Sequence, residues 1–368
     1  MVTLSKVAKS VVHDSLRPKP DEVVLISAFP HSIELAEDIG LECQKAGADP
    51  AIFLDTDALH YEQFKNYPIE AIRKTSAHCL GLLDYVNSYV WLVGPKDPSR
   101  MATVPDEKYA ALFEGEKAHG DKALEKKPKN VAVGLGQVTR ERAKAYGFNF
   151  AKWKAMVEAA TTVNYERMAS LGTLIAGLLA NPVTVRLRAD NGTDVKVRLA
   201  GPARPAIVDD GRISDEDLAR GTAADRSVFL PAGEVAVAPV EDSAEGTFVA
   251  DVPMPQRGRL IEGLSWTFRK GHVTDFTAKR NLRFAQTNWA GASGQKDMFG
   301  GLGFGLNAKA LPGFLTNQIV SGSVSVRIGE NRDIGGANDS SYIFIGTVAH
   351  GDVEIGGKKV IEDGAWII

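Results

Sequence analysis

The side chains with the clearest capacity for chemistry lie between residues 230 and 345. Glu234 stands in the segment LPAGEVAVAP, and a lone carboxylate in a buried site costs several kcal/mol unless it is paired. If this segment lines a pocket, Glu234 serves as a general base or as a clamp for a cationic or hydrogen-bonding group of a substrate. The alternative is a structural ion pair, for which the candidate cations are Arg327, Lys309 and Arg280.

Two further residues complete the catalytic candidates. Lys309 would act as a base if burial favoured its neutral form. Tyr342 contributes a polar group to the segment SSYIFIGTV of residues 340–348. No Ser/His/Asp order and no reactive-cysteine context indicates nucleophilic catalysis.

A polar set rich in amides accompanies these residues and supplies the candidates for substrate binding. Amides and hydroxyls bind substrate oxygens and nitrogens, and they position a substrate rather than activate it. For the asparagines the alternative is turn chemistry, because Asn and Asp beside Gly are common at positive φ. Arg327, in the alternating segment VSVRIG, would meet an internal carboxylate, hold an anionic substrate or lie in solvent. The substrate-binding candidates are Asn307, Ser325, Arg327, Asn331, Asn338 and Asp339.

Metal ligands are sparse in this half of the chain. His272 and His350 are its two histidines, and neither has an acidic residue spaced to share a metal on one strand. His350-Gly351-Asp352 has the spacing most similar to a metal-ligand pair, and we interpret it as a surface turn. Cys43 and Cys79 give no disulfide framework and no zinc spacing. We therefore predict no metal site and no cofactor.

The elements that must position these side chains belong to two domains, expected at residues 1–160 and 161–368. The first domain alternates apolar strands with helical patterns, which predicts an α/β domain with a parallel sheet. Its expected helices span 3–16, 32–47, 151–162 and, at the domain boundary, 165–179, and its expected strands span 22–28, 50–54, 89–93 and 130–133.

The second domain is expected to be mainly antiparallel β, in an α+β arrangement. Residues 184–199 alternate apolar and polar side chains on both sides of Asn191-Gly192, the strongest short signal of a hairpin. Residues 204–226 read as a polar loop with a short helix at 214–220. The glycine run GGLGFG at 300–305 lacks the helix and acidic partner of a dinucleotide site, so we interpret it as a tight turn.

Composition limits the partners. The chain has 368 residues, 44% hydrophobic content and a formal net charge of −3, so no basic field points to nucleic acid or to an anionic membrane. No run of about 18 apolar residues predicts a membrane span, and no leader-like segment is evident. We expect a cytoplasmic protein that acts on a small molecule.

Several segments in the second half, taken in order, resemble the thermophilic aminopeptidase family of aminopeptidase T and aminopeptidase S. The resemblance covers most of the second domain, whereas the first domain matches at the level of strand order. The segments are LPAGEVAVAP, DSAEGTFVAD, GLGFGLN, GSVSVRIG, GGAN and VIEDGAW, together with the hairpin at 184–199.

This resemblance implies a site for two metal ions, held in the family by two glutamates, two histidines and an aspartate. Position by position, the first glutamate is Glu234, the second falls on Gly301, and the first histidine on Ser325. The histidine and aspartate that stand one residue apart fall near Ile343 and Ile345. The 2,5-dihydroxypyridine dioxygenases of the same fold family keep one iron, and their ligands are missing here as well.

Three hypotheses follow. The first is an aminopeptidase-fold enzyme that works without the two-metal site on a small molecule, by hydrolysis of an amide or ring bond. The second is a metallo-aminopeptidase whose ligands lie elsewhere or bind a divalent metal weakly. The third is a non-catalytic binding or scaffold protein. The resemblance also implies a homodimer.

Overall fold

The computed structural model describes residues 4–92 and 94–368, which form two compact units. Unit 1 comprises residues 1–162 and 211–232, and unit 2 comprises residues 163–210 and 233–368. The sequence boundaries placed 211–232 in the second domain. This segment lies in unit 1 because its strand β8 (Ser227–Leu230) pairs in parallel with β4 (Lys129–Val133).

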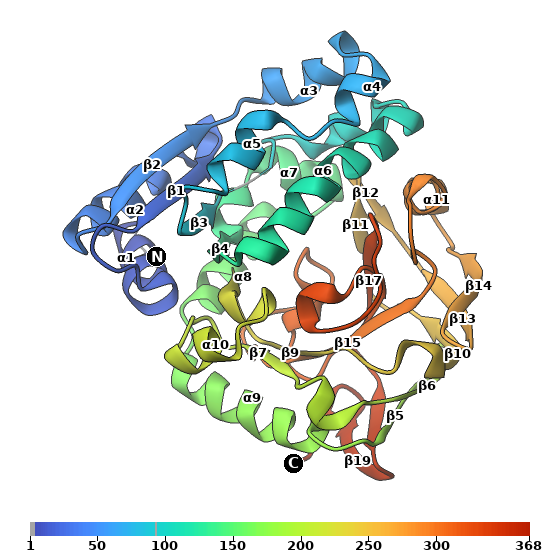
Figure 1. Ribbon diagram of the computed structural model, residues 1–368. Coiled ribbons are helices and arrows are strands. Elements are labelled where there is room, and N and C mark those ends of the chain that lie inside the picture. Colours follow the sequence, from blue (N-terminus) through green and yellow to red (C-terminus); the bar gives the residue numbers. More distant parts are fainter. Residues whose placement is uncertain (1–3, 93) are drawn as a thin grey trace. The chain divides into compact units, whose positions relative to one another are not determined.

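Unit 1 is built on a five-stranded sheet with the order β2-β1-β3-β4-β8, and every pair in it is parallel (Figure 1). The predicted α/β class is therefore confirmed. The remaining strands are β1 (Val23–Ala28), β2 (Asp49–Leu54) and β3 (Ser88–Trp91). Val23–Ala28 reads VVLISA, an almost continuous apolar run of the kind that a strand covered on both faces requires.

Helices cover both faces of this sheet. On one face α2 lies close to β1, since a Cβ atom at Gly40 would stand 3.7 Å from Ile26 Cδ1, whereas Leu83 and Ala123 pack against Leu25 and Tyr89 on the other. The helices of unit 1 are α1 (Leu4–Lys9), α2 (Ile33–Lys45), α3 (Asp57–Asn66), α4 (Ile69–Ile72), α5 (Ala77–Leu82), α6 (Asp106–Lys126), α7 (Arg140–Tyr146), α8 (Phe150–Thr161) and α10 (Asp215–Arg220). The expected helix at 3–16 is α1 followed by a π-helical segment at Ser10–Leu16. Residues 3 and 93, at the ends of two predicted elements, lie outside the described residues.

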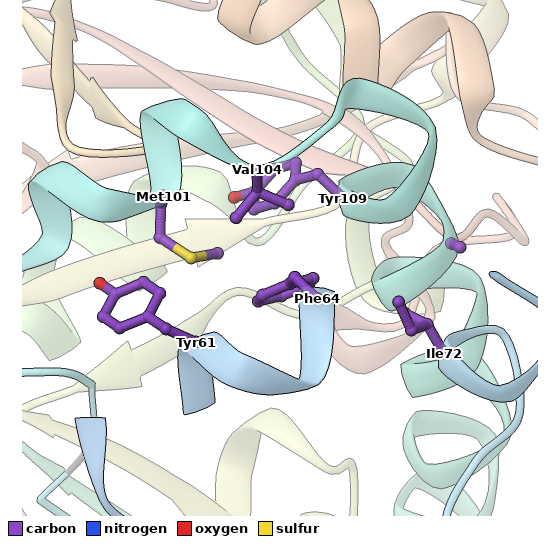
Figure 2. Close-up of a cluster of buried hydrophobic side chains, with 7 residues drawn as sticks. Tyr61, Phe64, Ile72, Met101, Val104 and Tyr109 are labelled. Atoms are coloured by element: carbon purple, nitrogen blue, oxygen red, sulfur yellow. The ribbon is translucent and has the colours of Figure 1, made fainter. Parts of the chain in front are cut away.

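A separate apolar cluster joins α3, α4 and α6 (Figure 2). Tyr61 and Phe64 project from α3 toward Met101, and Tyr109 closes the cluster from α6. Tyr61 Oη donates to the carbonyl oxygen of Asp97 at 2.5 Å, so the one polar atom of that ring is satisfied.

Unit 2 confirms the predicted antiparallel β domain. One sheet has the order β14-β13-β10-β6-β5-β18-β19-β20, a second has the order β17-β16-β15-β9-β7, and β11 and β12 form a small ribbon. The first sheet contains β5 (Thr184–Ala189), β6 (Thr193–Arg198), β10 (Glu245–Val249), β13 (Ser265–Arg269), β14 (His272–Thr277), β18 (Asp352–Ile355), β19 (Lys358–Glu362) and β20 (Ala365–Trp366). The second contains β7 (Ile207–Asp209), β9 (Glu234–Val237), β15 (Phe299–Gly305), β16 (Val324–Gly329) and β17 (Ile343–Val348). The ribbon is β11 (Met254–Gln256) and β12 (Arg259–Ile261), and the helices are α9 (Tyr165–Leu179) and α11 (Leu282–Gly291).

Aromatic side chains fill the space between the two sheets. The ring of Trp266 lies 5.5 Å from that of Phe248 and 6.0 Å from that of Phe344, and Phe268 meets Phe299 at 5.0 Å. All five rings are buried. The predicted hairpin is present as β5 and β6, with Gly192 at φ +101° in its turn.

The glycine run at 300–305 is not the tight turn that the sequence analysis expected. It forms most of β15, the central strand of the five-stranded sheet, and every residue of β15 is buried. The pattern misled because glycine is rare inside strands, where it marks a close approach of another group. That approach defines the candidate site.

Candidate functional site

The candidate site lies on the face of the five-stranded sheet that carries the glycines of β15. Side chains alternate along a strand, so this face presents Glu234 from β9, Gly303 from β15, Ser325 from β16 and Thr347 from β17. The opposite face presents Phe304 and other apolar residues to the core between the sheets.

Gly303 is required by the group that lies over it. A Cβ atom at this position would stand 1.9 Å from Glu234 Oε1 and 2.6 Å from Ser325 Oγ. The absence of a side chain therefore opens the space in which the carboxyl group and the hydroxyl meet across β15. Ser325 Oγ donates to Glu234 Oε1 at 3.1 Å.

We call the side chains of Glu234, Ser325 and Thr347, with Gly303 between them, the row. Glu234 is the one sequence-predicted catalytic residue that the structure places in this row. Burial raises the pKa of Glu234 to about 7, against the smaller lowering effects of the Ser325 hydrogen bond and the positive charge of Arg327. Within residues 4–92 and 94–368 its carboxyl group forms no ion pair. The structural ion pair that the sequence left open is therefore not what fills this space.

Thr347 ends the row and is a residue that sequence reasoning missed. It pairs with Ser325 in the β16–β17 register and is 1% exposed. Its Oγ1 atom is buried and has no hydrogen-bond partner among the described residues. A buried hydroxyl without a partner costs roughly 1–3 kcal/mol, so Thr347 offers an unused polar atom on the third strand from that of Glu234 in the sheet order. The alternation of SSYIFIGTV could have indicated the face of Thr347, but not the missing partner.

Arg327 shares this face but its guanidinium is engaged elsewhere. It donates to the two carboxylate oxygens of Asp333 at 2.6 and 3.1 Å and to the carbonyl oxygen of Glu330 at 2.6 Å. Arg280, a second candidate partner of Glu234, pairs with Glu262 instead. Arg327 therefore acts on Glu234 through its charge rather than by contact.

The three asparagines proposed for substrate binding are buried, and their side-chain amides form hydrogen bonds within the chain, mostly to backbone groups. Asn307 Oδ1 accepts from the backbone N–H groups of Lys309 and Ala310. Asn331 Nδ2 donates to Glu241 Oε1 and to the carbonyl oxygen of residue 300. Asn338 Nδ2 donates to the carbonyl oxygens of residues 299 and 329. Each amide holds a turn or a strand end, but none of the three residues adopts the positive φ of the alternative offered from the sequence.

The other three candidates lie apart from the row. Lys309 is exposed, so the burial on which its role as a base depended is absent. Tyr342 is 3% exposed, and its hydroxyl lies 3.4 Å from the carbonyl oxygen of Ala285. The carboxylate of Asp339 lies 3.2 Å from Arg332 at the surface. The structure thus brings together Glu234 and Ser325 from the predicted set and adds Thr347.

The donor set of this face does not fit a two-metal centre. Hydroxyl, glycine and isoleucine stand where the resemblance requires imidazoles and further carboxylates, and these are the groups that hold such ions. In the part of the chain that the structure describes, no group of three or more His, Cys, Asp or Glu side chains is placed to hold a metal ion. His272 pairs with Asp297, and His350 lies 3.6 Å from Asp363.

Comparison with known proteins agrees with the resemblance inferred from the sequence. The family model described as thermophilic metalloprotease (M29) matches residues 184–294. The fold is similar to that of wild-type AmpT from Thermus thermophilus, with a TM-score of 0.69 and 17% identity over 99% of each chain. It is also similar to 2,5-dihydroxypyridine dioxygenase from Pseudomonas putida KT2440, with a TM-score of 0.62 and 13% identity over 100% of this chain and 98% of that one. No curated protein sequence matches the chain. Among the described residues, no helix is long and apolar enough to cross a membrane.

Proposed function

Because the chain resembles the thermophilic metalloprotease (M29) family, we propose that it is a hydrolase of that fold which works without the two-metal site. Its substrate is a small polar molecule with an amide or ring carbon–nitrogen bond. The observation that carries this proposal is Glu234, a half-buried carboxyl group with a pKa of about 7, one hydroxyl partner and no ion pair to any described residue. A general base is most effective when its pKa lies near the working pH.

In this proposal Glu234, Ser325 and Thr347 each have a separate role. Ser325 donates to Oε1 and so fixes the carboxyl group, which leaves Oε2 for proton transfer. Ionised Glu234 takes a proton from water while the water oxygen bonds to the carbonyl carbon. The carbon–nitrogen bond then breaks, and Glu234 returns the proton to the leaving nitrogen. The unpartnered Thr347 hydroxyl is available to donate to the substrate oxygen on which charge develops.

The test compares wild-type protein with Glu234→Gln on a panel of aminoacyl anilides, N-acyl amides and cyclic imides, with and without a chelator. We expect turnover that survives chelation and is lost in E234Q, with kcat/KM rising as the pH passes through 7. Turnover retained in E234Q would contradict the role of Glu234 as the general base. Turnover that chelation removes and a divalent metal restores would instead favour the metallo-aminopeptidase.

A non-catalytic protein would show a different combination of results. It would bind members of the same panel through Glu234 and Thr347 without converting any of them. The homodimer and the cytoplasmic setting expected from the sequence belong to this proposal too, and gel filtration with light scattering tests the dimer.

A further inference from the structure

Unit 1 contains a cavity that the proposed hydrolase chemistry does not use. It has a volume of about 200 Å³ and lies between strands β3, β4 and β8 of the parallel sheet and the C-terminal half of α6. Sites for drug-sized ligands commonly span about 300–1,000 Å³, so this cavity suits a smaller molecule, of the size of one or two fused rings.

Aromatic side chains form the floor of the cavity. Tyr89 and Trp91 point to the same face of β3, and their rings lie 5.3 Å apart with 12° between their planes. Leu83 and Leu124 add apolar walls. Such a surface favours a flat ring, because aromatic contacts add to the free energy that burial of apolar area supplies.

Asn130 is the polar group of this floor. The strand register places it between Tyr89 of β3 and Ser227 of β8, so the three side chains form one row across the sheet. In the part of the chain that the structure describes, its Oδ1 atom is buried without a hydrogen-bond partner, whereas the Ser227 hydroxyl already donates to the carbonyl oxygen of Ala223. A carboxamide that lines a cavity in this state presents an acceptor and a donor side by side.

The electrostatics of the cavity favour an uncharged ligand. Its described lining contains no acidic side chain. Burial lowers the pKa of His119, so its imidazole is neutral near pH 7. Lys127 stands at the exposed rim, and its ammonium group donates to the carbonyl oxygen of Gly221. A cationic ring would lose hydration in this cavity without gaining a counter-charge, and the charge of Lys127, which would face an anionic ring, lies at the exposed rim, where solvent screens it.

We propose that this cavity binds an uncharged heteroaromatic ring of nucleobase size whose edge carries a hydrogen-bond donor next to an acceptor. Tyr89 and Trp91 contact the ring, and the Asn130 carboxamide forms two hydrogen bonds with its edge. A carboxamide reads the edge of adenine in this way in nucleic-acid complexes. The ring therefore displaces water from the floor and satisfies the buried Oδ1 atom.

The test titrates the full-length protein with adenine by calorimetry, and with indole as a ring that has a donor but no adjacent acceptor. We expect adenine to bind at submillimolar concentration and indole to bind at least about tenfold more weakly, because indole can donate to the carboxamide oxygen but offers no acceptor to the carboxamide N–H, so one of the two hydrogen bonds is missing. Absence of adenine binding at millimolar concentration would overturn the proposal. Equal affinity for the two rings would do the same, since the cavity would then be a general apolar pocket.

Variants locate the site. Asn130→Leu should weaken adenine binding at least about tenfold and narrow the difference between adenine and indole. Trp91→Leu should weaken both rings, which keeps the proposal testable if the first variant does not fold. The matched control is Phe229→Ala, on the same face of the sheet but outside the lining, and it should leave both affinities unchanged. Adenine affinity that survives both Asn130→Leu and Trp91→Leu would place its binding elsewhere.

Discussion

Ser325 donates its hydroxyl hydrogen to Glu234 across a strand that neither residue belongs to. The bond of 3.1 Å passes over Gly303 of β15, and the glycine is what lets the two side chains meet. Where the family resemblance implies a metal centre, this chain holds a half-buried carboxyl group and a buried hydroxyl.

The first prediction concerns Glu234→Gln and pH. Burial raises the pKa of Glu234 from an ordinary 4.5 to about 7 in the folded chain. Between these values the unfolded chain releases its proton first, so this group lowers the free energy of unfolding as the pH rises from 4.5 to 7. The amide does not titrate. The stability of E234Q relative to wild type should therefore increase over that window, by roughly 3 kcal/mol at most.

Urea unfolding at pH 5, 6, 7 and 8 measures this difference. Most of the change should fall between pH 5 and 7 and level off above pH 7. A difference that stays constant across the series would show that the carboxyl group titrates normally in the folded chain.

The second prediction concerns Gly303→Ala. The new Cβ atom would lie 1.9 Å from Glu234 Oε1, so the carboxyl group must leave its place over β15. We expect a loss of roughly 2–4 kcal/mol in the free energy of unfolding. Part of this loss should be recovered in Gly303→Ala/Glu234→Ala, because the double variant removes the clashing atom.

A matched control for that prediction comes from α9. The Cβ of Gly177→Ala would meet nothing within 4 Å, and this exposed helical position should gain roughly 0.5–1 kcal/mol. Thermal unfolding of these three variants and of Glu234→Ala compares them directly. Additive losses in the double variant would contradict the contact between Glu234 and the space above Gly303.

The third prediction concerns Arg327→Gln. The guanidinium lowers the pKa of Glu234 by its charge while it contacts Asp333. Loss of that charge should raise the pKa of Glu234 further. Asp333→Asn is the control, since it breaks the ion pair but keeps the positive charge. Carbon-13 NMR of labelled glutamate follows both titrations, and equal pKa values in wild type and R327Q would contradict the electrostatic link.

The sequence predicted the fold far better than it predicted the site. The apolar runs of β1 and β4 and the alternation around Asn191-Gly192 report local backbone structure, and the parallel sheet and the hairpin follow from them. The short helices α3, α4 and α5 have no counterpart among the predicted elements, because each offers few apolar residues at helical spacing.

The site depends on cross-strand register, which local patterns do not contain. Ser325 lies 91 positions from Glu234 in the chain and meets it only through the pairing of β9, β15 and β16. The asparagines beside glycine were equally consistent with binding and with turns; in the structure Asn307 holds a turn, whereas Asn331 and Asn338 donate to carbonyl oxygens near strand ends. The sequence does not distinguish Thr347 from other strand threonines, because the missing hydrogen-bond partner of its Oγ1 atom is visible only in the folded chain.

The fourth prediction concerns Thr347→Val, in which stability and function should change in opposite directions. The Thr347 hydroxyl is buried without a partner, so replacing it by a methyl group removes an unsatisfied polar atom at nearly constant volume. The free energy of unfolding should rise by about 1 kcal/mol. Ser325→Ala is the matched control, because it removes a hydroxyl that has a partner, and it should lower stability and raise the pKa of Glu234.

If the row binds substrate, Thr347→Val should also weaken turnover or binding, since a destabilising group kept at a functional site trades stability for activity. A fall in the stability of Thr347→Val would show that the hydroxyl is hydrogen-bonded in solution, and the row would then lose the unused polar atom on which its proposed contact with substrate depends.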